Sequence, residues 1–185
     1  MLDYKSDTTD KSINNKEILN VGGKDQKNKM AMISINKIDI ENTDYYDEVC
    51  VLLKEAQKYL LGFKWCNEIE KGWLVENFGY ILNIYLFKIL PDKKTCFDEY
   101  IWIVVGDIPP AYIDIISAKN AYEALETYII VMQEWVNNVY QCKSVDDCFP
   151  INVPPHKEYA DMLNSRLKSL ERDFLPLIKN TITLF

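Results

Sequence analysis

The sequence has one histidine, six glycines and no long apolar run. The missing apolar run and the few glycines argue against a membrane protein, a secreted protein and a phosphate-binding loop. No stretch reaches the ~18 apolar residues that a membrane-crossing helix needs. The polar stretch from Asp3 to Lys29 lacks the apolar centre of a signal peptide. Gly22-Gly23-Lys24 follows no expected strand, which argues against a phosphate loop. We therefore expect a cytoplasmic protein without a membrane partner.

Positive charge is also in short supply. The chain has 21 Lys and Arg residues against 28 Asp and Glu residues, which gives a net charge of −7. Nucleic-acid binding needs clustered Lys and Arg, so we expect no nucleic-acid partner. An acidic surface keeps a protein soluble, and it also suits a basic protein partner. Both explanations of the charge stay open at this point.

Cysteine is present, but its pattern favours neither disulfides nor a metal site. The five cysteines are odd in number and widely spaced: Cys50, Cys66, Cys96, Cys142 and Cys148. The five-residue gap between the last two matches none of the short spacings of zinc sites. We expect free thiols in a reducing compartment, with no metal and no cofactor.

The chain divides into a polar head and a folded part. Residues 1–30 carry only scattered apolar side chains, which cannot offset the entropy lost on ordering, so this segment is predicted to be disordered. Residues 31–185 are expected to form a single α+β domain, since their number is typical of one domain.

Two helices are expected to open the domain. After a cap at Asn42 or Thr43, apolar residues recur at helical spacing until Gly62 ends the first helix. A second, shorter helix is predicted over residues 65–75, although Gly72 weakens it.

Three strands are predicted next, over residues 80–90, 100–105 and 111–116, which are rich in branched and aromatic residues. Their short connections favour an antiparallel sheet. The first two are apolar almost throughout, which indicates that both faces of the sheet are covered, most simply by helices on one face and by the remaining chain on the other.

Two helices are expected to close the domain. The first starts at Ser117 or at Asn120, and Asn120 forms a capping-box pattern with Glu123. The second begins after Pro154-Pro155, and Pro176 ends or kinks it. The predicted fold is an antiparallel three-stranded sheet packed with about four helices, in the order ααβββαα.

The turn between the second and third strands is the most informative segment. Gly106 allows a positive φ or the close approach of another backbone. Asp107 can bond its own following amides, and Pro109-Pro110 stiffens the turn. Rigid loops at a sheet edge often carry binding sites, and the alternative is a well-made reversal between two strands. Three amphipathic rings either form a contact surface or fill the core: Trp102, Tyr112 and Trp135.

Catalytic patterns are weak. His156, the single histidine, has no recognisable nucleophile or orienting carboxylate nearby, so a surface or capping role is favoured over a Cys–His hydrolase. Six carboxylates flank the expected strands: Glu68, Glu70, Asp98, Glu99, Asp107 and Asp114. Paired carboxylates can act as acid and base, but on an acidic protein a solvated rim is the simpler interpretation. No catalytic residue is assigned.

Three runs carry a resemblance to a known family: Gly106-Asp107-Ile108-Pro109-Pro110-Ala111-Tyr112, the stretch from Tyr122-Glu123-Ala124-Leu125 to Trp135-Val136, and Pro150-Ile151-Asn152-Val153-Pro154-Pro155 leading to Arg166-Leu167. Over residues 65–175 the chain resembles a family of uncharacterised bacterial proteins, a domain of unknown function. The resemblance implies a bacterial cytoplasmic protein and no particular activity. His156 stands where a hydroxyl cap would be expected, which weakens a catalytic role for it.

Two functions from different classes remain. The first is a protein-binding module, either an immunity-like neutraliser of a basic toxin or an accessory protein, with Asp107, Tyr112, Trp135 and Arg166 as candidate binding residues. The second is a small enzyme of unknown class that uses the Asp107 loop with Arg166. A deep pocket around those groups would favour the enzyme.

Overall fold

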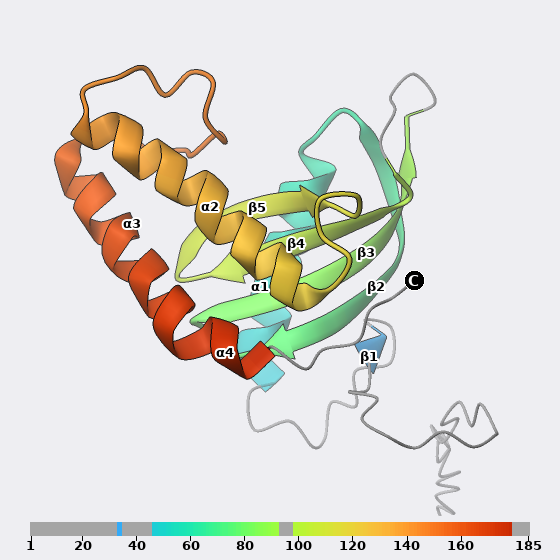
Figure 1. Cartoon of the computed structure of the whole chain (residues 1–185). Helices are drawn as coiled ribbons and strands as arrows, with labels where there is room; N and C mark the ends of the chain where they lie inside the picture. The colour runs from blue at the N-terminus through green and yellow to red at the C-terminus, as the bar shows by residue number, and fades with distance from the viewer. Residues whose placement is uncertain (1–32, 35–45, 93–97, 179–185) are drawn as a thin grey trace, which may run out of the picture.

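Five antiparallel strands form one sheet in chain order, and helices lie on both of its faces (Figure 1). The computed structural model describes residues 33–34, 46–92 and 98–178. The strands are β1 (Ile33–Ser34), β2 (Cys66–Asn77), β3 (Leu82–Pro91), β4 (Tyr100–Gly106) and β5 (Ile108–Asp114). Because β1 has two residues, four strands make up nearly all of the sheet.

The helices precede and follow the sheet. They are α1 (Tyr46–Leu61), α2 (Ala121–Tyr140), α3 (Lys157–Ser169), a π-helical turn over Leu170–Phe174 and the short α4 (Leu175–Ile178). Helix α1 covers one face of the sheet, and α2 lies on the other with α3 beside it (Figure 1). The fold is therefore α+β, as predicted.

The face under α1 is closed by one helix. Alternate side chains of a strand point to opposite faces, and one set from β3 and β4 packs against α1: Tyr85, Phe87, Ile89, Ile101, Ile103 and Val105. Helix α1 meets them with residues spaced by three and four: Val49, Leu52, Ala56 and Leu60. Each fully buried apolar side chain of this kind stabilises the fold by about 1.5–3 kcal/mol.

The opposite face carries the other set. Leu82, Ile84, Leu86, Trp102 and Val104 pack there with α2, α3 and α4 in a larger cluster. Both faces are thus covered, as the continuous apolarity of β3 and β4 predicted, but a helix lies on each face rather than on one alone.

The predicted helix over residues 65–75 is wrong, because these residues belong to β2, the longest strand. The strand contains three register shifts against β3, and each bulge interrupts the alternation by which a strand is recognised. Its first half is also rich in Asn, Glu and Lys, which do not favour strands. The prediction was three strands and about four helices in the order ααβββαα. The structure has four long strands and three main helices in the order αββββαα.

Several local predictions are confirmed. Helix α1 ends at Leu61, and the amide of Gly62 donates to the carbonyls of Lys58 and Tyr59. Asn120 caps α2 by accepting from the amide of Glu123 at 2.9 Å, and the Glu123 carboxylate accepts from the amide of Lys119 at 2.8 Å.

The effect predicted for Pro176 takes the form of a wider helical turn. The amide of Leu175 donates to the carbonyl of Leu170, five residues back, immediately before the proline. A proline clashes with the carbonyl four residues before it, and the π turn relieves that clash. The predicted caps at Asn42 or Thr43 and the predicted disordered segment 1–30 lie outside the described residues. No described helix is long and apolar enough to cross a membrane.

Candidate functional site

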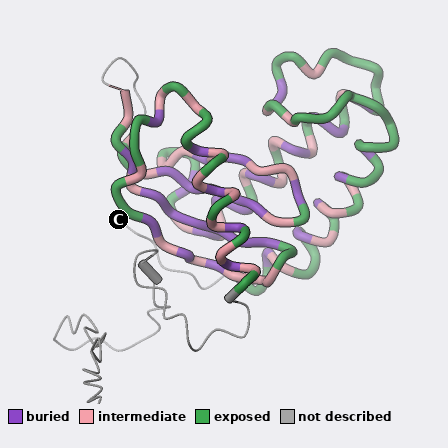
Figure 2. The backbone as a smooth tube through the Cα atoms, turned by 180° about the vertical axis from the view of Figure 1, so that it is seen from behind, coloured by how far each residue is buried: buried purple, intermediate pink, exposed green. Residues whose placement is uncertain are grey.

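A groove of about 280 Å³, which we call the α3 groove, lies between the sheet and the helical pair α2–α3. Seen from behind, the end of this pair and its connecting loop extend beyond the sheet (Figure 2). Four elements contribute to the lining: the β4–β5 turn, α2, the loop between α2 and α3, and α3.

Helix α3 supplies one wall. Tyr159, Met162, Leu163 and Arg166 follow one another at spacings of three, one and three, so they share one face of the helix. Leu163 is buried, whereas Met162 is 48% exposed and Tyr159 is 38% exposed. The wall is therefore apolar and open to solvent along its outer part.

The loop after α2 supplies a second wall through Ile151 and Val153. Asn138 fixes this loop at its start, because its side-chain amide donates to the carbonyl of Ser144 and lies 3.1 Å from the sulfur of Cys148. Further along, the ring of Phe149 lies 5.5 Å from that of Tyr112. The wall is thus attached to both α2 and the sheet.

Trp135 lies at the base of the α3 groove and is 2% exposed. The other fully buried tryptophan, Trp102, donates its indole N–H to the carbonyl of Ala118 at 2.8 Å. Trp135 makes no such bond with any described residue. Both tryptophans therefore belong to the core, and Trp135 also lines the groove and has an indole N–H that bonds to no described residue.

The β4–β5 turn approaches the β2–β3 turn so closely that it needs glycine. Gly106 has φ +151°, and a Cβ there would overlap the carbonyl of Ile81. The next amide, that of Asp107, donates to the carbonyl of Tyr80 at 3.0 Å. The predicted use of Gly106 for close backbone approach is confirmed.

Asp107 and Arg166 form an ion pair that joins the turn to α3. The Nη2 atom of Arg166 lies 3.0 and 2.8 Å from the two carboxylate oxygens of Asp107, and its Nε donates to the Asp107 carbonyl at 2.6 Å. The carboxylate was expected to bond its own following amides, and it accepts from Arg166 instead. A planar guanidinium that holds both oxygens fixes orientation as well as distance.

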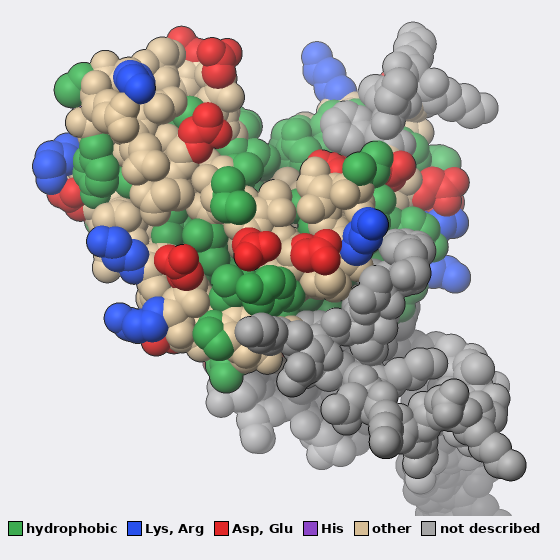
Figure 3. Space-filling model, viewed as in Figure 1, with side chains coloured by type: hydrophobic (Ala, Val, Ile, Leu, Met, Phe, Trp, Pro, Cys, Tyr) green, Lys and Arg blue, Asp and Glu red, His purple; other side chains and the backbone are tan. Residues whose placement is uncertain are grey.

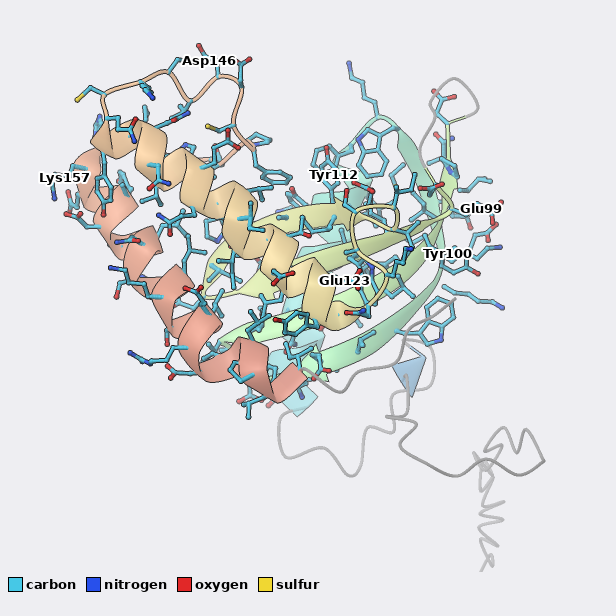
Figure 4. All side chains as sticks on the ribbon, viewed as in Figure 1. Glu99, Tyr100, Tyr112, Glu123, Asp146 and Lys157 are labelled. Atoms are coloured by element: carbon cyan, nitrogen blue, oxygen red, sulfur yellow. The ribbon has the colours of Figure 1, made fainter. Side chains whose placement is uncertain are left out.

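Three of the four candidate binding residues come together here. Asp107, Trp135 and Arg166 all line the α3 groove, whereas Tyr112 does not. Its ring packs against Phe63 and Trp65 on the α1 side of the sheet, at centroid distances of 5.1 and 5.2 Å. Tyr112 lies away from α3 in Figure 4, although its ring also contacts Phe149 of the loop after α2.

The weaker catalytic candidates do not converge. His156 is exposed at the start of α3, makes no capping bond through its side chain, and its ring lies 6.3 Å from that of Tyr159. Glu70 pairs with Lys88 at 2.8 Å, and Asp114 accepts from the amide of Ser117 at 2.7 Å. Within the described part of the chain, no three His, Cys, Asp or Glu residues are placed to hold a metal ion.

The outer edge of β5 is closed to strand addition near the groove. Pro109 and Pro110 have no amide hydrogen, and the hydroxyl of Tyr128 donates to the Pro109 carbonyl at 2.9 Å. Burial raises the pKa of Tyr128 well above its usual value, so the hydroxyl stays protonated and can donate. A partner at this site has to use the groove rather than extend the sheet.

Sequence reasoning missed Val153, Tyr159 and Met162, which line the exposed part of the groove. Their signal was present but ambiguous, because Tyr159 and Met162 have the spacing of a buried helix face. Only packing shows that Ala160, Leu163 and Leu167 fill the core while their neighbours stay open. Comparisons with protein-family models, with curated proteins and with solved structures find no match to this chain.

Proposed function

We propose that this protein is a protein-binding module without catalytic activity, of the immunity-like or accessory kind, in a bacterial cytoplasm. The α3 groove carries this proposal. Three apolar side chains on its open side are 38–48% exposed, over a tryptophan that is buried. Exposed apolar clusters of this kind on a polar protein mark sites of interaction.

The shape and chemistry of the groove favour binding over catalysis. The described residues that line it include no histidine or cysteine, and its two charged groups, Asp107 and Arg166, neutralise each other. An acid–base pair needs groups that environment drives to different protonation states. The groove is also open to solvent along Met162 and Tyr159, which does not support the alternative of a small enzyme.

The charge of the protein supports a basic partner. Helix α2 carries Glu123, Glu126 and Glu134 and no Lys or Arg. Figure 3 shows acidic side chains over the exposed face of this helix. Complementary charge speeds the encounter of two proteins, which suits the neutralisation of a basic toxin.

A capture experiment tests the proposal. The full chain is immobilised as wild type, as Met162→Gln and as Leu61→Gln, and each is exposed to an extract of the source cells. Leu61 is a matched control because it is 50% exposed at the end of α1, outside the groove. We expect a partner that the wild type and Leu61→Gln retain and that Met162→Gln loses. Equal recovery on all three forms would contradict binding through the groove.

A further inference from the structure

We infer that the α3 groove takes a linear segment of the partner protein in which a bulky apolar side chain stands next to Lys or Arg. This inference rests on the proposed function and specifies the chemistry of the partner. The bound segment has three parts: an apolar anchor, a peptide backbone and a positive charge. Each part is inferred from a different feature of the groove.

The anchor follows from the lining. Trp135 forms the base, Met162 and Val153 form the open sides, and the volume of about 280 Å³ admits side chains rather than a folded domain. Methionine is flexible and polarisable, so it adapts to large apolar groups of different shapes. Buried aromatic anchors supply much of the affinity at protein interfaces.

The backbone of the segment follows from the polar groups. The indole N–H of Trp135 has no acceptor among the described residues, so a bound group with a carbonyl can accept from it. A peptide carries such a carbonyl at every residue. The segment cannot pair with β5 as an added strand at Pro109 and Pro110, because neither residue has an amide hydrogen to donate. Recognition therefore depends on side chains and isolated carbonyls.

The positive charge follows from the acids around the opening. Asp107 lies at one end with its side chain 69% exposed, although it pairs with Arg166. Glu158 is exposed one turn before Met162 on α3. The whole chain carries a net charge of −7. The lysine at the start of α3, Lys157, is held by Asp161 at 2.7 Å, so it offsets little of this charge. A cation beside the anchor fits this surface.

The test uses a phage-displayed library of random 12-residue peptides selected on the full-length wild-type chain. We expect enrichment of sequences with an aromatic or large aliphatic residue within three positions of Lys or Arg. A synthetic peptide of the consensus should bind Met162→Gln at least 10-fold more weakly than wild type and bind Leu61→Gln equally. Val153→Thr, an almost isosteric change, gives a second groove variant if the first fails to fold.

A second peptide isolates the charge. Replacement of its Lys or Arg by Gln should weaken binding at least 5-fold at 50 mM NaCl, and the difference should shrink at 500 mM because salt screens exposed charges. Enriched peptides that need Met162 but lack cationic residues would show that the bound segment needs no Lys or Arg. That result would contradict this part of the inference and would not affect the proposed function. Peptides that bind all groove variants equally, or no enrichment at all, would overturn the inference, whereas only the capture experiment decides the proposed function.

Discussion

Both faces of the sheet are buried under helices, and the face under α2 and α3 leads to the α3 groove. On the α1 face, a single helix packs against the strands, and Tyr85, Phe87 and Ile89 are at most 1% exposed. On the other face, α2 pairs with α3, and the end of the pair extends past β5 (Figure 2). On this helical pair, Met162 and Tyr159 stay 48% and 38% exposed.

The two faces also differ in where their polar side chains make contacts. Under α1, the side-chain amide of Asn83 donates to the Tyr85 hydroxyl at 3.2 Å, and that hydroxyl lies 3.3 Å from the Val49 carbonyl. This chain of contacts is internal. On the α2 side, the Asp107–Arg166 ion pair lies at the surface, 59 positions apart in sequence, and joins two walls of the groove. The α2 side also has internal bonds, from Trp102 to the Ala118 carbonyl and from Tyr128 to the Pro109 carbonyl, so the Asp107–Arg166 pair is an addition at its surface.

The largest effect on stability is expected at Gly106, where the β4–β5 turn meets the β2–β3 turn. Gly106→Ala places a Cβ against the Ile81 carbonyl at φ +151°, so either β4 or the β2–β3 turn has to move. We expect a loss of about 3 kcal/mol or more in the free energy of unfolding, since backbone strain and steric overlap add. Urea denaturation measures it. A loss below about 1 kcal/mol would show that the two turns are not tightly joined.

Much of this arrangement follows from local sequence, and the rest does not. Gly106, the cap at Asn120 and the covered strands β3 and β4 were predictable because each depends on neighbouring residues or on a simple period. Strand β2 was not, because its bulges break the period. The pairing of Asp107 with Arg166 depends on where α3 docks, and no local pattern encodes that distance.

The two tryptophans provide the next largest effect. Trp102→Phe and Trp135→Phe remove the same volume from nearly buried positions, so their cavity costs are similar. Only the first also leaves the buried Ala118 carbonyl without its donor. We therefore expect Trp102→Phe to cost about 1–3 kcal/mol more than Trp135→Phe in urea denaturation. Equal costs would show that the bond from Trp102 to the Ala118 carbonyl contributes nothing measurable to stability.

A smaller effect of opposite sign is expected under α1. Asn83 is fully buried, and its side-chain oxygen has no partner among the described residues. Asn83→Val removes that oxygen and one hydrogen bond to Tyr85, and it adds apolar contact with the core. Because an unpaired buried acceptor is costly, we expect stability to stay unchanged or to rise by about 1 kcal/mol. Thermal and urea denaturation should agree, and a loss above about 1 kcal/mol would assign the amide a structural role.

The smallest change in stability, with a larger change in binding, is expected at the ion pair. Asp107→Asn keeps the shape of the side chain and removes its charge. The Asp107 side chain is 69% exposed and that of Arg166 35%, so the lost attraction should lower stability by no more than about 1 kcal/mol. The backbone bond from Arg166 to the Asp107 carbonyl remains, and the fold should be intact.

Binding should respond more strongly than stability, because the pair sets the separation of two walls of the groove. We expect the consensus peptide to bind Asp107→Asn about 5-fold more weakly than wild type. Asp161→Asn is the charge control, since the Lys157–Asp161 pair lies on α3, carries the same charges and does not reach the sheet. Because Asp161 also accepts from the Tyr140 hydroxyl of α2, the stability of this variant is measured beside its binding. If both variants weaken the peptide equally, net charge explains the loss. If only Asp107→Asn does, which is the result that we expect, the loss arises at the groove itself. The Gln variant of the peptide then separates the two local causes: a loss that persists with the uncharged peptide is due to the geometry held by Arg166, and a loss that disappears is due to the Asp107 charge.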